Sequence, residues 1–173
     1  LIVPGGGPFA DLVRTTQKQL GFNDSIAHQM AILGMAQFGC LLHGFPPYLP
    51  LQRTLTFPDF SQKETQSRIW LPDVSILLST PLPHSWSVTS DTIAAWLACE
   101  LGIRNLLLVK SVDLPFEPQH AKELASQDII DSTLPDLMLQ SELRVWSSGP
   151  IPPERLEKAL EDPEAYLTQV IPT

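Results

Sequence analysis

The chain has 173 residues, 43% of them hydrophobic and 17% charged, which predicts one globular domain with a substantial core. Its net charge of −8, with only 11 lysine and arginine residues and no cluster of them, argues against a nucleic-acid partner. No apolar run approaches the roughly 20 residues that cross a bilayer, and no signal peptide is recognisable, so we expect a cytoplasmic protein without a membrane partner.

The first part of the chain predicts a short strand and two helices. Leu1–Val3 is apolar and β-prone, and the apolar spacing that follows predicts a helix that stops at Gly21. Asn23 and its neighbours offer caps for a second helix, which we expect to end at Gly39. Because the sequence starts without methionine, inside what reads as the second half of a strand, we expect residues 1–173 to form a single domain truncated at its N-terminus.

Seven prolines then divide the segment from Cys40 to Pro83 into short pieces. RIW (68–70) and SILL (75–78) are the most strand-like or buried of them. Cys40 and Cys99 lack the spacing of a metal or redox motif, and we interpret them as buried free thiols rather than a disulfide. The four histidines also lack ligand spacing, so we assign no metal site.

The clearest unit is WSVTSDTIAAWLACELGIRNLLLVKSVD (86–113). Thr89 or Ser90 caps a helix that Gly102 closes, and Leu106–Val109 reads as a strand buried on both faces. A helix near His120–Ser126, a strand LRVW (143–146) and a helix PPERLEKALED (152–162) follow. Strands that alternate with helices predict an α/β fold.

Three motifs in this pattern can carry chemistry. Gly5, Gly6 and Gly7 stand where a strand passes into a helix, and they favour equally a tight turn and a close approach of backbone N–H groups to phosphate. The stretch VTSD (88–91) is explained by a helix cap or, less well, by contacts to a ligand. Lys110 follows a strand at the carboxyl end where ligands gather in α/β sheets, although it is also where a strand emerges into solvent.

The sequence resembles the amino acid kinase family, which includes carbamate, acetylglutamate, aspartate and UMP kinases. The stretches that carry the resemblance follow one another in the family's order: IVPGGGPFADLVR, WSVTSDTIAAWLACELG and LLLVKSVD. The resemblance is firm over residues 1–21 and 84–113. LPHSWSVTSD and NDSIAHQMAILGMAQFG are most similar to its small branch that phosphorylates (aminomethyl)furanmethyl phosphate. The resemblance implies a three-layer αβα sandwich around a mainly parallel sheet, carbamate kinase-like, with its first strand absent from this sequence.

The resemblance also implies an activity, in which ATP with Mg²⁺ donates its terminal phosphoryl group to a small phosphate, carboxylate or carbamate acceptor. (Aminomethyl)furanmethyl phosphate of methanofuran biosynthesis is the candidate acceptor, and family members are commonly homo-oligomers. The positions that match the family's functional residues are Asp91, Gly6 and Gly7 for catalysis; Gly5, Gly6, Gly7, Ser87, Thr89 and Ser90 for the acceptor; and Lys110, Ser111 and Asp113 for the nucleotide.

Three departures from the family leave other interpretations open. No Lys-x-Gly-Gly precedes Leu1, Leu114-Pro115 replaces the glycine expected after Asp113, and LTQVI (167–171) lacks the glycine of Gly-Thr-x-Ile. The alternatives are a non-catalytic relative that binds nucleotides or oxyanions for regulation or storage, and an unrelated α/β binding domain. For a kinase we expect the glycines, the Asp91 helix start and the Lys110 strand end to face one pocket. We also expect Gly6→Val to abolish turnover and spare the fold.

Overall fold

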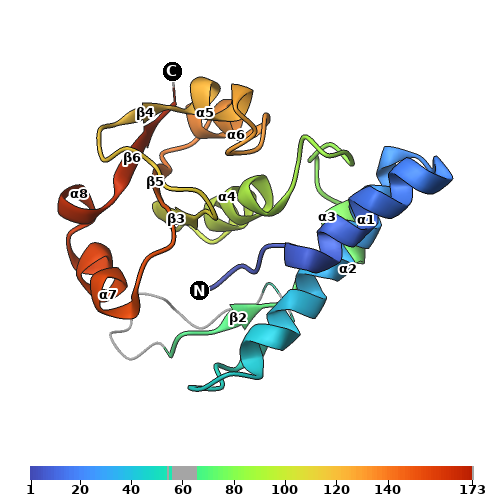
Figure 1. The fold of residues 1–173 in the computed structure, drawn as a ribbon, viewed down its shortest axis with the longest axis horizontal. Coiled ribbons are helices and arrows are strands. Elements are labelled where there is room, and N and C mark those ends of the chain that lie inside the picture. The colour runs from blue at the N-terminus through green and yellow to red at the C-terminus, as the bar shows by residue number, and fades with distance from the viewer. Residues whose placement is uncertain (54, 56–65, 173) are drawn as a thin grey trace. The chain divides into compact units, whose positions relative to one another are not determined.

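The structure is a computed structural model that describes residues 1–53, 55 and 66–172. The chain divides into two compact units, Leu1–Ser90 and Asp91–Thr173. Each of them contains both helices and strands (Figure 1), so the predicted α/β class is confirmed.

A small parallel sheet lies in the first unit. Ile2 pairs with Ile69 of β2 (Ile69–Trp70), and β2 pairs in turn with β1 (Leu51–Gln52). Trp70 donates its backbone N–H to the Ile2 carbonyl at 2.8 Å, and the next N–H, of Leu71, bonds the Gln52 carbonyl at 2.8 Å. The strand character predicted at the chain start and in RIW is therefore confirmed.

Two long helices accompany this sheet, α1 (Gly7–Leu20) and α2 (Asp24–His43). Gly21 ends α1 in the left-handed conformation, with φ of 72°, and donates its N–H to the Gln17 carbonyl. The Asn23 side chain caps α2 by accepting the Ile26 N–H at 3.0 Å. The two helices pack on each other, and α2 also packs on β1, β2 and α3 (Val74–Leu78).

The predicted end of α2 at Gly39 is wrong, because the helix continues to His43 and is followed by Gly44. Gly39 is buried, and a Cβ there would lie 2.4 Å from Leu71 Cδ2 and 3.2 Å from Pro4 Cγ. This glycine lets the helix pack closely on the sheet and does not terminate it.

SILL is helical and not a strand. The Asp73 side chain accepts N–H groups from Ser75 and Ile76, which fixes the first turn of α3. The Ser75 hydroxyl also donates to Asp73, and this bond, followed by that from the Ile76 N–H, lowers the pKa of the Asp73 carboxyl. Leu77 is buried, so the expectation of burial holds while the secondary structure differs.

Among the described residues, one helix is long and apolar enough to cross a membrane by length and composition. It is α2, with 20 residues and a mean hydropathy of 1.3, so the statement that no apolar run approaches this length is corrected. Core helices of globular proteins meet the same criterion, and Ala27, Ile32 and Met35 of α2 are buried here.

The second unit contains a four-stranded sheet in the order β3-β5-β6-β4. Its strands are β3 (Asn105–Val109), β4 (Gln119–His120), β5 (Arg144–Ser148) and β6 (Thr168–Ile171). The β3–β5 and β4–β6 pairs are parallel and the β5–β6 pair is antiparallel, so the sheet is mainly parallel as predicted.

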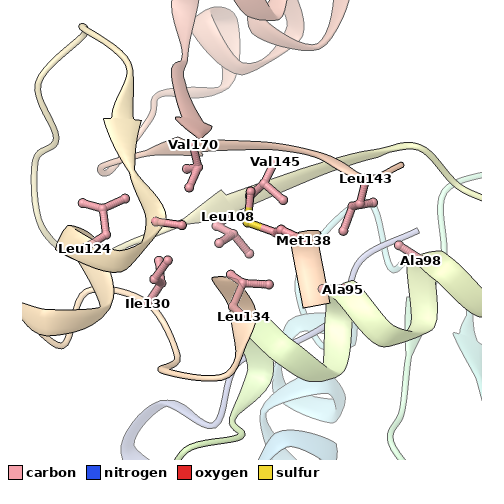
Figure 2. Packing of buried hydrophobic residues seen from close by; sticks show 11 residues of the cluster. Ala95, Ala98, Leu108, Leu124, Ile130, Leu134, Met138, Leu143, Val145 and Val170 are labelled. Carbon is pink, nitrogen blue, oxygen red and sulfur yellow. The ribbon is translucent and has the colours of Figure 1, made fainter. Parts of the chain in front are cut away.

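Helices cover both faces of this sheet. On one face, Leu108 and Val145 pack with side chains of α4 (Ser90–Glu100), α5 (Ala121–Ser126) and α6 (Leu134–Leu139), as Figure 2 shows. On the other face, Trp146 packs with Ala159 of α7 (Pro153–Glu161) and with Leu167, which follows α8 (Pro163–Tyr166). The second unit is thus layered as helix, sheet and helix.

Two predictions of burial are wrong. In β3 only Leu108 is buried, at 5% exposure, while Val109 is 57% exposed, because β3 stands at one end of the strand order. Cys40 and Cys99 are free thiols as expected, but both are exposed at the surface of their helices.

Replacing Gly39 with alanine should destabilise the protein, although alanine is the better helix former. The added methyl group meets the buried Leu71 side chain, and overpacking of this kind costs about 1–3 kcal/mol of unfolding free energy. Urea denaturation measures the loss, with Cys40→Ala at the exposed neighbouring position as control. Equal stability of the two variants would contradict the packing role of Gly39.

Candidate functional site

The three glycines lie in the first unit, after the bridge that Ile2 makes to β2, and lead into α1, whose first residue is Gly7. Gly6 is the N-cap of α1, and a Cβ there would lie 2.3 Å from the Ala10 Cβ. Gly7 has a φ of 50°, and a Cβ there would lie 3.0 Å from the Phe38 ring. Both positions therefore require glycine for the turn and for packing, and the expectation that Gly6→Val spares the fold does not hold.

Gly5 differs from its two neighbours. Its φ is outside the left-handed region, and a Cβ there would lie 3.7 Å from Ser90 Oγ, an ordinary van der Waals distance. Packing thus leaves room for a side chain at position 5. A backbone that must approach a ligand closely is the other reason for a glycine. Gly5 and Ser90, both predicted to contact the acceptor, are brought together in this unit.

The remaining predicted acceptor residues, Ser87 and Thr89, lie in the segment that leads to α4. The Ser85 and Ser87 hydroxyl oxygens are 2.7 Å apart, and the Val88 N–H bonds the Ser85 carbonyl at 3.1 Å. The Val88 side chain is buried, which places the hydroxyl groups on an anchored stretch of chain.

In the second unit, the start of α4 is held by the connection between α5 and α6. The Thr92 N–H donates to Asp131 Oδ2 at 3.0 Å, and the Thr92 and Thr133 hydroxyl oxygens are 3.0 Å apart. The backbone N–H of Asp131 bonds the Asp91 carboxylate in return. Sequence reasoning missed Asp131 and Thr133, because nothing in their local sequence indicates a partner about forty residues away.

A buried ion pair joins α4 to the end of β3. Lys110 Nζ lies 2.8 Å from Asp91 Oδ2, and the two side chains are 19% and 9% exposed. Burial raises the pKa of the Asp91 carboxyl; the Lys110 charge opposes this rise and the Asp131 charge adds to it. Two predicted site residues are thus brought into direct contact, and Asp91 fixes the lysine at the carboxyl end of a parallel strand.

A cleft of about 130 Å³ lies beyond the carboxyl ends of β3 and β5 in the same unit. Of the predicted nucleotide residues, Asp113 lines this cleft and Lys110 and Ser111 do not. Sequence reasoning missed the other residues that line it, which include Phe116, Ser148, Gly149, Arg155, Tyr166 and Thr168. Ligands of α/β proteins bind at this end of the sheet.

Two details of the cleft bear on binding. Ser148 Oγ is buried and has no hydrogen-bond partner in the part of the chain that the structure describes, so a polar group is left for a ligand or water. A Cβ on Gly149 would lie 2.7 Å from Asp113 Oδ1 and 2.9 Å from Asp113 Cα. The loops after β3 and β5 therefore touch through their backbones.

The fold and these elements define an α/β protein with a cleft and a fixed lysine at the carboxyl end of its sheet, and its relatives are kinases. The structure matches that of UMP kinase from Ureaplasma parvum with a TM-score of 0.60 at 17% identity, over 90% of this chain and 75% of that one. The sequence is 28% identical to the [5-(aminomethyl)furan-3-yl]methyl phosphate kinase of Methanocaldococcus jannaschii, over 99% of this chain and 83% of that protein. No protein-family model matches the sequence.

These similarities confirm the resemblance to the amino acid kinase family that the sequence motifs indicated, and they confirm its fold. Both relatives are kinases. The interpretation as an unrelated α/β binding domain is therefore wrong.

Lys110→Met should lower the unfolding free energy at neutral pH by about 3 kcal/mol, because it leaves a buried carboxylate without its counter-charge. A carboxyl whose pKa is raised in the folded state weakens the fold as pH rises from its ordinary value of 3.8 through the raised value. The stability gap to the unsubstituted protein should thus be small near pH 4, grow with pH and then level off.

The double variant Asp91→Asn/Lys110→Met provides the control, since it lacks the titrating carboxyl group. Urea denaturation of the three proteins from about pH 4 to about pH 8 makes the comparison. If the unfolding free energies of Lys110→Met and the unsubstituted protein differ by the same amount at every pH, Asp91 does not depend on Lys110 for its charge.

Proposed function

We propose that this protein is an ATP-dependent phosphotransferase that moves the terminal phosphoryl group of ATP to a small phosphate, carboxylate or carbamate acceptor. The observation that carries the proposal is the buried Asp91–Lys110 pair, which holds a cationic group at the carboxyl end of β3. Similarity to a phosphate kinase along nearly the whole chain supports it.

The candidate acceptor is [5-(aminomethyl)furan-3-yl]methyl phosphate, for which the Methanocaldococcus relative is named. Backbone N–H groups at Gly5, Gly6 and Gly7 and hydroxyl groups at Ser87, Thr89 and Ser90 are the donors that a phosphate monoester requires. An oxygen of this phosphate attacks the terminal phosphorus of ATP while the bond to the ADP oxygen breaks, and the products are a diphosphate and ADP.

The cleft at the ends of β3 and β5 is proposed to bind the nucleotide. Its residues fit such a ligand, because Tyr166 and Phe116 offer aromatic surface and Ser148 offers a buried hydroxyl group without a partner among the described residues. Asp113 lines the cleft, and Lys110 and Ser111 are the further nucleotide residues that the family resemblance implies. Mg²⁺ bound to ATP supplies positive charge to the phosphates.

Phosphoryl transfer depends on positioning and on neutralising the charge of the migrating group. In a chain with a net charge of −8, this neutralisation has to be local. Asp91 keeps the Lys110 ammonium group in one place, and the glycine N–H groups donate hydrogen bonds without carrying a side chain. Transfer is direct, and no group of the protein becomes phosphorylated.

A non-catalytic relative that binds nucleotides or oxyanions is the second candidate. Leu114-Pro115 after Asp113 and the missing glycine in LTQVI favour it, because both change stretches that carry glycine in the family. For either candidate we propose a cytoplasmic homo-oligomer, as the family resemblance implies.

ADP release tests the proposal. The chain, mixed with ATP, Mg²⁺ and [5-(aminomethyl)furan-3-yl]methyl phosphate, should release ADP, and Lys110→Ala should lower kcat on the order of 10³-fold through loss of one cationic contact. Lys122→Ala, on the exposed side of α5, is the matched control and should retain full rate. Thermal stabilisation by ATP without ADP release from any phosphate, carboxylate or carbamate acceptor would favour the non-catalytic candidate.

Substitutions of the three glycines should distinguish an effect on turnover from an effect on folding. Gly5→Ala should keep the melting temperature, because the packing has room for the added methyl group. It should lower turnover, because this methyl group would keep a bound phosphate away from the backbone. Gly6→Ala and Gly7→Ala should lower the melting temperature, since both methyl groups clash within the first unit. Full activity of Gly5→Ala would remove the glycine loop from the proposed site.

A further inference from the structure

The segment of residues 84–89 has turns and bends but no regular secondary structure, and it carries two of the hydroxyl groups assigned to the acceptor. Groups on a loop bind with accuracy only when the loop itself is held by its surroundings. The contacts of this segment with the rest of the first unit therefore bear on the proposed reaction.

Trp86 docks this segment on α1. Its indole Nε1 donates to the Gln17 side-chain oxygen at 2.6 Å, and the Arg14 guanidinium carbon lies 3.9 Å from the centre of the indole ring. Arg14 and Gln17 are three residues apart and so lie on the same side of the helix. Both the face and the polar edge of the indole are thus engaged by a single helix.

Gln17 connects Trp86 to the start of α2 as well. Its side-chain nitrogen donates to the Phe22 carbonyl at 3.1 Å and to Asp24 Oδ1 at 2.8 Å. At the beginning of the same segment, the His84 ring stacks on His28 of α2, with centroids 5.6 Å apart and planes inclined by 15°. The segment is therefore attached to both long helices of the first unit.

The helix that receives Trp86 is the one that starts at the glycine loop. Ser90, which follows the segment directly, lies beside that loop, since its Oγ is 3.7 Å from the Cβ position of Gly5. We propose that Trp86, anchored by Gln17, is a positioning residue that holds the Ser87–Ser90 hydroxyl groups in register with the glycine loop, so that the two sets of donors bind one acceptor. This proposal rests on the proposed function, and it assigns to Trp86 an effect on the acceptor and not on ATP.

Steady-state kinetics with [5-(aminomethyl)furan-3-yl]methyl phosphate and ATP tests this role. Trp86→Ala should raise the KM for the acceptor about tenfold or more and leave the KM for ATP within about twofold, because displacements near 1 Å weaken a site strongly. Trp86→Phe keeps a ring under Arg14 but loses the N–H group, so its effect should be smaller. Gln17→Met removes the same indole hydrogen bond and also those to Phe22 and Asp24, so its effect on the acceptor KM should be at least that of Trp86→Phe. The effects of the two variants should not add, since both remove the Trp86–Gln17 hydrogen bond.

Trp70→Phe is the control for destabilisation alone, because Trp70 is fully buried in β2 of the same unit. It should lower the melting temperature without separating the two KM values. A Trp86→Ala protein whose acceptor KM is unchanged, or whose two KM values rise together, would overturn the positioning role. Absence of ADP release from the unsubstituted chain would instead overturn the proposed function, and the role of Trp86 with it.

Discussion

A carboxylate that is almost removed from water stays charged only while its partners stay in place. Asp91 is such a carboxylate, so the elements of the second unit that carry its partners have to keep their positions. Its partners come from two directions, the Lys110 ammonium group at the end of β3 and the backbone N–H of Asp131 before α6. Asp131 in turn holds the Thr92 N–H. The start of α4, the end of β3 and the connection between α5 and α6 are therefore fixed by one set of charges, and the role proposed for Lys110 requires a cationic group fixed in this way.

The first unit also holds its proposed ligand-binding groups in fixed positions, but it does so without a buried charge. Its proposed ligand-binding groups are backbone N–H donors and hydroxyl groups, which lie on irregular chain or at the first residue of a helix. Close packing holds the glycine loop, where Gly6 meets Ala10 and Gly7 meets Phe38. Aromatic and amide contacts hold the hydroxyl segment through Trp86 and Gln17. Neutral donors of this kind bind an anion at a lower desolvation cost than charged side chains do.

Local signals in the sequence were sufficient where the structure is decided locally. The cap at Asn23, the stop at Gly21 and the prolines that open α7 all mark real helix boundaries. Prediction failed where distant packing decides: Gly39 serves the contact with Leu71, and β3, at one end of the strand order, is only partly buried. The α3 error was avoidable, since Pro-Asp-Val-Ser carries a helix cap in its own sequence.

The residues of the candidate site also fall into those that the sequence predicts and those that only the structure reveals. Asp91 and Lys110 could be found from motifs and family order, and the structure brings their side chains into contact. Asp131, Thr133 and Ser148 could not, because their importance comes from partners or surroundings far along the chain. Trp86 lay within a recognised motif, but only the three-dimensional contacts reveal what its indole touches.

The backbone contact between Gly149 and Asp113 has a consequence for how this protein can diversify. A side chain at position 149 has no space while the loop after β3 keeps its present path, and that path already departs from the family through Leu114-Pro115. The two loops must therefore change together. A transplant of either loop from a relative has to bring the other loop from the same donor, because each occupies the space beside the other's backbone.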